Sequence, residues 1–96
     1  MFQSRGEYVK AKEHHEKALA IKKVIGDRRG KATDYEKLGV LFCSVAKYVK
    51  AEEHLQKAFA IRKEIGDKKG EAYCYLNLGR VFKSHGGYQK SVEYLE

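Results

Sequence analysis

An internal repeat with a period of 40 residues is the feature that most constrains the fold of this chain. When residues 6–45 are laid over residues 46–85 without a gap, 21 of the 40 positions are identical. The motif that begins at Tyr8 returns at Tyr48, and a third copy opens at Gly86. Periods of this length are typical of solenoids, in which each unit buries its apolar face only against its neighbours.

Within one repeat the apolar residues keep the spacing of two amphipathic helices. They recur at steps of three and four from Tyr48 to Ile65, and a second, shorter stripe runs from Ala72 to Phe82. No segment alternates apolar and polar residues with the period of two that indicates a strand. These patterns predict an all-α chain, an α-solenoid of antiparallel helix pairs, with helices over 7–25, 31–45, 47–65, 71–85 and 88–96.

The repeat also predicts how the chain is divided. We expect residues 1–96 to form a single solenoid fragment of about two and a half repeats. Residues 6–30 supply the second helix of one repeat and a linker, residues 31–70 form a full repeat, and residues 71–96 form a repeat that is truncated in its second helix.

Glycines mark two different kinds of position in this pattern. Gly26 and Gly66 follow the long helices, where a left-handed residue is favoured, and we expect Gly30 and Gly70 to close the short polar loops that come next. Gly39 and its copy Gly79 lie inside helices, where glycine costs about 1 kcal/mol relative to alanine. A partner helix must therefore approach closely there, and we expect the core to comprise these two glycines with Ala11, Ala18, Tyr35, Phe42, Tyr48, Ala51, Ala58 and Phe82.

The order of these packing residues resembles a known repeat. An aromatic residue, Leu-Gly and a second aromatic are followed by a small residue, Tyr and two alanines: Tyr35, Leu38-Gly39, Phe42, Ala46, Tyr48, Ala51 and Ala58. This order resembles the tetratricopeptide repeat, although Tyr stands for the frequent Trp and the usual proline is absent. The 40-residue period and the Gly-Asp-basic-basic-Gly linker are similar to the longer repeats of Pins-type regulators of G-protein signalling. The resemblance implies a protein–protein interaction scaffold whose concave groove holds an extended peptide or a partner helix.

The residues expected to face that groove differ between the copies, whereas the packing residues repeat. The predicted peptide-binding residues are Thr33, Lys37, Val40, Ser44, Tyr73, Asn77, Arg80 and Lys83, with Ser84 as an alternative to the last. We expect the amide of Asn77 to bond a peptide backbone. We expect Lys37, Arg80 and Lys83 to pair with carboxylates of an acidic or mixed protein or peptide ligand.

Basic residues near the linkers suggest an alternative function, binding of nucleic acid or phosphoinositide. The net charge is +7, and basic pairs recur as Lys22-Lys23, Arg28-Arg29, Arg62-Lys63 and Lys68-Lys69. Cations near helix C-termini also complement the helix dipole, and most tyrosines occupy packing positions instead of stacking positions. We therefore do not expect a nucleic-acid partner. A purely structural spacer in a longer array is the other alternative.

The residue types that carry chemistry do not form a catalytic or metal-binding pattern. Three residues separate Gly26 from Gly30, where a phosphate-binding loop needs four. His14 and His15 are adjacent, so they point to different helix faces, and the sequence has no pair of histidines with the spacing of a zinc site. Cys43 and His85 lack an evident third group to orient them. We predict no catalytic residues, no metal site, no cofactor and no enzyme.

The remaining expectations concern location and assembly. No apolar run approaches the roughly 20 residues that span a bilayer, and no signal segment is seen, so we expect a cytoplasmic protein with reduced, inert cysteines. Terminal repeats of a solenoid normally carry a polar outer face. Here the first helix leaves Tyr8, Ala11, Ala18 and Ile21 partly uncovered, which predicts self-association through uncapped ends at high concentration.

Overall fold

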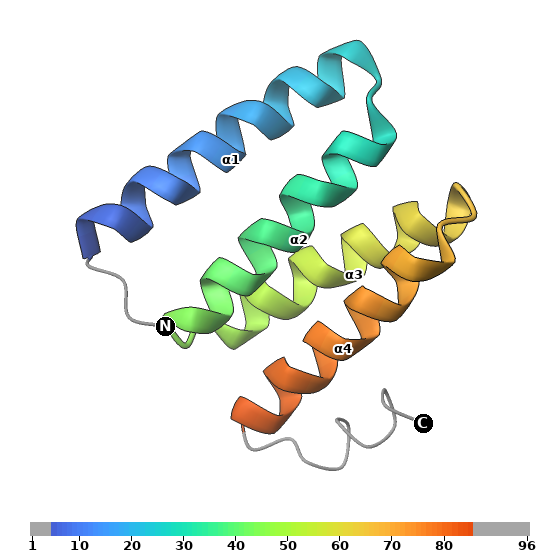
Figure 1. The fold of residues 1–96 in the computed structure, drawn as a ribbon. Coiled ribbons are helices and arrows are strands. Elements are labelled where there is room, and N and C mark those ends of the chain that lie inside the picture. Colours follow the sequence, from blue (N-terminus) through green and yellow to red (C-terminus); the bar gives the residue numbers. More distant parts are fainter. Residues whose placement is uncertain (1–4, 86–96) are drawn as a thin grey trace.

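Four helices joined by short turns make up the described part of the molecule (Figure 1). The computed structural model describes residues 5–85, and its helices are α1 (Arg5–Ile25), α2 (Arg28–Ser44), α3 (Tyr48–Glu64) and α4 (Lys68–Ser84). No strand occurs within 5–85, and consecutive helices run antiparallel. The prediction of an all-α helical solenoid is confirmed. The helix predicted over 88–96 lies outside the described residues.

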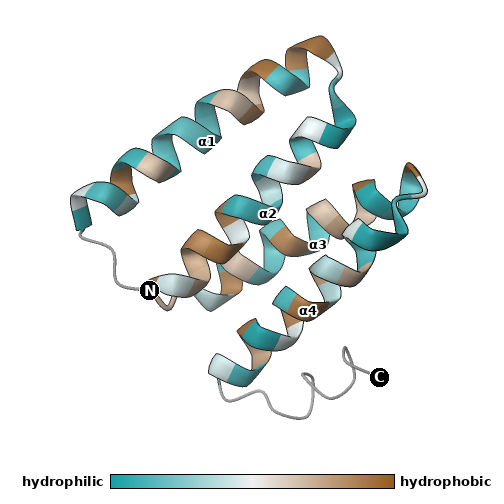
Figure 2. Ribbon diagram, in the orientation of Figure 1, coloured by the Kyte–Doolittle hydropathy of each residue, from teal (hydrophilic) through white to brown (hydrophobic). Residues whose placement is uncertain are grey.

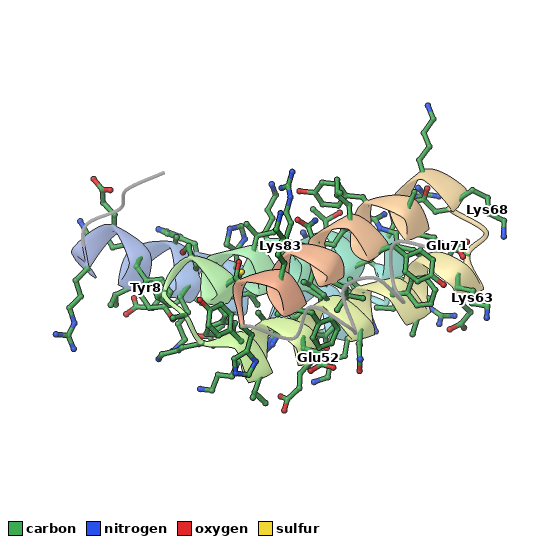
Figure 3. The ribbon with its side chains drawn as sticks, turned by 90° about the horizontal axis from the view of Figure 1, so that it is seen from below. Tyr8, Glu52, Lys63, Lys68, Glu71 and Lys83 are labelled. Atoms are coloured by element: carbon green, nitrogen blue, oxygen red, sulfur yellow. The ribbon has the colours of Figure 1, made fainter. Side chains whose placement is uncertain are left out.

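Helix α2 occupies the centre of this arrangement. It contacts each of the other three helices, whereas α1 contacts α2 alone among the described helices. The molecule measures 38 × 36 × 18 Å, so it forms a slab about as thick as two layers of helices. Figure 3 shows this slab from its edge, with α4 in front.

The core follows the repeated packing residues. Ala51, Leu55 and Ala58 are completely buried, and Phe42 is 2% exposed. A Cβ atom added to Gly39 would lie 2.6 Å from Cγ of Leu55 and 3.2 Å from the carbonyl oxygen of Ala51. Glycine therefore allows α3 to approach α2 closely, as the sequence predicts.

The starts of α2 and α4 correct the sequence prediction. Both helices begin three residues earlier than expected, because the aspartate before each one caps it. A side-chain oxygen of Asp27 accepts a hydrogen bond from the backbone N–H of Gly30 at 2.9 Å, and Asp67 accepts one from Gly70 at 3.0 Å. Gly30 and Gly70 thus lie in the first turn of a helix and do not close a loop.

Close packing at the caps explains why glycine stands at both positions. A Cβ atom on Gly30 would lie 2.7 Å from Cγ of Asp27, and one on Gly70 would lie 2.6 Å from Oδ2 of Asp67 and 2.8 Å from Nε of Arg62. Any larger residue would push the capping aspartate away. The left-handed residues that end α1 and α3 agree with the prediction, since Gly26 and Gly66 have φ angles of 75° and 74°.

Two buried carboxylates of α2 pair with cations from opposite sides. Asp34, 4% exposed, has its Oδ2 atom 2.8 Å from Nζ of Lys22 in α1. Glu36, 6% exposed, accepts a hydrogen bond from Nε of Arg62 in α3 at 2.9 Å. The guanidinium of Arg62 also donates to Asp67 at 3.0 Å. Burial disfavours the charge of Arg62, but the hydrogen bond and the charge of Glu36 outweigh this and raise its pKa.

Burial differs from the sequence prediction at the two outer helices. Tyr8 of α1 was expected to be partly uncovered and is only 8% exposed, as a member of the buried core, with Nζ of Lys47 6.0 Å from the centre of its ring. Tyr75 and Ala72 of α4 were expected in an apolar packing stripe and are exposed, Tyr75 by 41%. Ile21 is 62% exposed, as expected.

Candidate functional site

A hollow between α1, α2 and α4 gathers half of the residues that the sequence predicts for ligand binding. Its volume is about 370 Å³. Lys37, Val40 and Ser44 reach it from α2, and Tyr73 reaches it from α4. The remaining lining residues are Ala11, His15 and Leu41.

Lys37 supplies the charge at the wall of this hollow. No carboxylate of residues 5–85 lines it, and Lys37 is exposed at its wall. His15 lies between the hollow and the buried Asp34, with its Nδ1 atom 3.3 Å from Oδ1 of that carboxylate. Asp34 is buried and pairs with Lys22, so its charge is balanced inside the fold.

Apolar side chains supply a second kind of contact in the hollow. Val40 is 41% exposed and Tyr73 is 49% exposed, so both present apolar surface to a ligand. Tyrosine also offers a hydroxyl group at the end of a rigid ring.

The structure corrects two predicted groove residues. Asn77 is only 4% exposed, and its amide donates a hydrogen bond to the carbonyl oxygen of Tyr73 at 3.1 Å, so it does not stand open to a peptide backbone. Thr33 is half-buried, and its hydroxyl donates to the carbonyl oxygen of Arg29 and accepts from Arg62. Asn77 thus bonds its own helix, and Thr33 bonds its own helix and Arg62 of the ion-pair network.

Arg80 and Lys83 are exposed on α4 but do not line the hollow. Three lining residues, Ala11, His15 and Leu41, are not among the residues predicted for the groove. One signal was available for His15, because it stands where the next repeat has the fully buried Leu55. A polar residue at a packing position of the repeat indicates a local function or a local partner, and here the partner is Asp34.

Most of the linker cations are already paired with carboxylates. Arg28 pairs with Glu64, and Arg29 lies 3.6 Å from Asp67. Nζ of Lys68 lies 3.5 Å from Glu71, at the end of the molecule where α3 passes into α4 (Figure 3). Lys22 and Arg62 are paired inside the fold, so fewer of the linker cations face solvent than the sequence pattern suggests.

The cysteines and histidines of the described residues form neither a reactive thiol nor a metal-binding cluster. Cys43 and Cys74 form no disulfide, and burial raises the pKa of the Cys74 thiol to about 12 and raises that of Cys43 as well. A thiol with so high a pKa is a poor nucleophile at neutral pH. Within residues 5–85 no three His, Cys, Asp or Glu side chains gather in a way that suits a metal ion. None of the four helices is long and apolar enough to cross a membrane.

Comparison with known proteins agrees with the repeat geometry. A family model described as tetratricopeptide repeat matches residues 1–64 and again residues 35–96, so the two matches together cover the chain. A search of curated proteins gave no match. The narrower likeness to Pins-type repeats stays a prediction. Tetratricopeptide repeats generally mediate protein–protein interactions and are generally not catalytic. This chain belongs to the tetratricopeptide repeat family.

Proposed function

We propose that this chain is a scaffold module that holds a segment of a partner protein in the hollow between α1, α2 and α4. The observation that carries the proposal is that Lys37, Val40, Ser44 and Tyr73 line one hollow. These residues come from two different repeats, and none of them is fully buried. Side chains that vary between copies on a common packing frame are what a solenoid uses to recognise a partner.

The proposed ligand is a peptide segment with acidic and apolar side chains. Lys37 favours a carboxylate, and Val40 and Tyr73 favour an apolar group beside it. Arg80 and Lys83 extend the cationic surface along α4 and suit further acidic residues of the same segment. A hollow of about 370 Å³ lies at the small end of the range for ligand sites, so it takes one or two side chains of the peptide.

The proposal includes a cytoplasmic location. Cys43 and Cys74 are both free in the structure, and neither thiol has a partner cysteine within residues 5–85. A small domain without disulfides suits a reducing compartment.

Fluorescence anisotropy with a defined probe tests the proposal. The probe is a short labelled peptide that alternates Glu with Leu, and the matched probe alternates Lys with Leu. We expect the Glu-containing peptide to bind and the Lys-containing peptide not to bind. A labelled oligonucleotide measured at two salt concentrations serves as the third probe, because strong and steeply salt-dependent binding to it alone would support the nucleic-acid alternative.

Variants of the hollow then locate the binding. Lys37→Ala and Tyr73→Ala should each weaken binding of the Glu-containing peptide by about tenfold, because each removes a contact at the centre of the site. Lys63→Ala is the matched control, since Lys63 is an exposed lysine on α3 that does not line the hollow. An equal effect of Lys37→Ala and Lys63→Ala would contradict the proposal. Absence of binding to every probe would favour the spacer alternative.

A further inference from the structure

Two lysines from different helices lie over the same buried aromatic ring. Nζ of Lys23 in α1 lies 6.0 Å from the centre of the Tyr35 ring, and Nζ of Lys57 in α3 lies 5.5 Å from it. Tyr35 belongs to α2, which contacts both of those helices. Both lysines are exposed, whereas Tyr35 is only 8% exposed. The fold thus brings two ammonium groups from separate helices to one point on its surface.

A third lysine extends this arrangement along α3. Nζ of Lys50 lies 5.6 Å from the centre of the Phe42 ring, which belongs to α2 about two helical turns after Tyr35. The imidazole of His54 contacts both aromatic rings, with its centre 6.0 Å from that of Tyr35 and 5.0 Å from that of Phe42. Figure 2 shows hydrophilic colouring that recurs along α3, the helix that supplies two of the three lysines. We name Lys23, Lys50 and Lys57 the lysine row.

The lysine row keeps its positive charge. None of its three ammonium groups forms an ion pair with a carboxylate of residues 5–85. Glu53 is exposed on α3 within one turn of Lys50 and Lys57 and pairs with neither, and Glu64 pairs with Arg28. An aromatic face attracts a cation but does not neutralise it, and the converging cations repel one another. An anion placed between them removes this repulsion.

The surroundings of the row favour a compact anion with several charged oxygens. Lysine binds phosphate as a point charge, whereas planar recognition of a carboxylate is the particular strength of arginine. Linked phosphate groups also bring more charge into a small volume than carboxylates spaced along a peptide. The Tyr35 and Phe42 rings are 8% and 2% exposed, so they are covered and do not offer a stacking surface to nucleic-acid bases.

From this cluster we propose that the lysine row binds a ligand that carries two or more linked phosphate groups. The row lies away from the hollow that holds the proposed peptide. Tyr35 and Lys37 are two residues apart in α2, so their side chains point to nearly opposite sides of that helix, and neither Tyr35 nor Phe42 lines the hollow. Binding of phosphate groups is therefore independent of the proposed peptide ligand.

Isothermal titration calorimetry with sodium tripolyphosphate tests the proposal. We expect saturable binding to one site per chain, weaker at higher salt because salt screens exposed charges. The double variant Lys23→Ala with Lys57→Ala should weaken this binding at least about tenfold. The matched control is Lys17→Ala with Lys63→Ala, since these exposed lysines are the repeat copies of the first pair and lie over no aromatic ring of residues 5–85. The control loses the same charge and should bind like the parent chain.

Vesicle flotation separates a lipid headgroup from a free ligand. Binding to phosphatidylcholine vesicles that contain phosphatidylinositol bisphosphate, without binding to phosphatidylserine vesicles of equal charge, would assign the row to a lipid headgroup. Binding to tripolyphosphate alone would assign it to a free ligand. The Glu-containing peptide should bind the Lys23 and Lys57 double variant as it binds the parent chain, so failure of one proposal is distinguished from failure of the other. Binding to neither phosphate probe, or an equal loss in the two double variants, would overturn the proposal.

Discussion

Helices α2 and α4 carry the same packing residues, yet they bury them to very different extents. Tyr35 is 8% exposed and its copy Tyr75 is 41% exposed, and Ala32 is fully buried while Ala72 is exposed. The difference arises because α2 has a neighbour on each side and α4 contacts only α2 and α3 among the described helices. In a repeat protein a residue's contribution to stability is thus set by the neighbouring unit as much as by its own type.

At one pair of equivalent positions in α2 and α4, the polar residue is buried and the apolar residue is exposed. Glu36 of α2 is 6% exposed, and Leu76 at the same place in α4 is 44% exposed. Glu36 is buried because Arg62 satisfies its charge with hydrogen bonds from two guanidinium nitrogens. Hydropathy alone would have placed these two residues the other way round.

Loss of the buried ion pair should have the largest effect on stability. Arg62→Ala leaves Glu36 buried without a cation and should lower the free energy of unfolding by about 3 to 5 kcal/mol. Urea denaturation followed by circular dichroism measures this loss.

A double variant shows whether the loss comes from the unpaired charge. Arg62→Met combined with Glu36→Leu removes both charges and should recover much of the stability, because apolar residues of similar size often replace a buried ion pair without cost. If the double variant were no more stable than Arg62→Ala, the large effect would have to come from lost packing instead.

The two tyrosines test the comparison directly. Tyr35→Ala should lower the free energy of unfolding by about 3 kcal/mol, as truncation of a buried aromatic ring does. Tyr75→Ala should lower it by less, about 1 to 2 kcal/mol, since the ring packs on Phe59 but is partly in solvent. Denaturant unfolding of the two variants under the same conditions provides the measurement. Equal losses would mean that α4 is covered in solution as completely as α2.

Replacing two glycines by alanine should change the stability of the chain in opposite directions, because only one of the two lies at a close contact between helices. Gly39→Ala puts a Cβ atom against Leu55 and should destabilise the chain by about 2 kcal/mol. Gly6→Ala, in α1, meets no atom within 4 Å and should stabilise it by up to about 1 kcal/mol through helix propensity. Thermal unfolding of both variants checks the signs, and a destabilising Gly6→Ala would contradict this account of the glycines.

The cap of α4 should give the smallest effect, and that effect should depend on pH. The backbone hydrogen bond from Gly70 lowers the pKa of Asp67, and the charges of Arg62 and Arg29 lower it further. A carboxylate whose pKa is lower in the folded state stabilises the fold above its unfolded-state pKa and loses this contribution as the pH falls through the folded-state pKa. Asp67→Asn keeps a capping side chain but removes the charge.

Asp67→Asn should therefore be less stable than the parent chain near neutral pH and equally stable at strongly acidic pH. Urea unfolding at a series of pH values measures the difference between the two chains. A difference that stays constant across the series would show that the charge of Asp67 is not responsible.

Local patterns were sufficient to predict the helices and the close approach at Gly39. The repeat fixes which residues are equivalent, and the helical spacing of apolar residues identifies the packing stripes. The starts of α2 and α4 were mispredicted, because Asp followed by Gly three residues later suits a turn as well as a capped helix start. Only the backbone shows that Asp27 caps α2.

Contacts between distant residues could not be read from the spacing. Arg62 and Glu36 are 26 residues apart, and nothing in either helix alone indicates that they pair. Lys37 and Tyr73, both predicted for the groove, line one hollow, whereas the amide of Asn77 turns back onto its own helix. A helical wheel gives the direction in which a side chain points, but it does not tell how deeply the neighbouring helices bury that side chain.

Native-state hydrogen exchange tests most directly the claim that neighbours set stability in this chain. In dilute solution the amides of α2 should exchange only through global unfolding, because helices cover it on both sides. The amides of α4 should exchange faster, through local opening that leaves α2 and α3 intact. Equal protection of α2 and α4 would contradict the account, since the same residues would then be equally stable with and without a second neighbour.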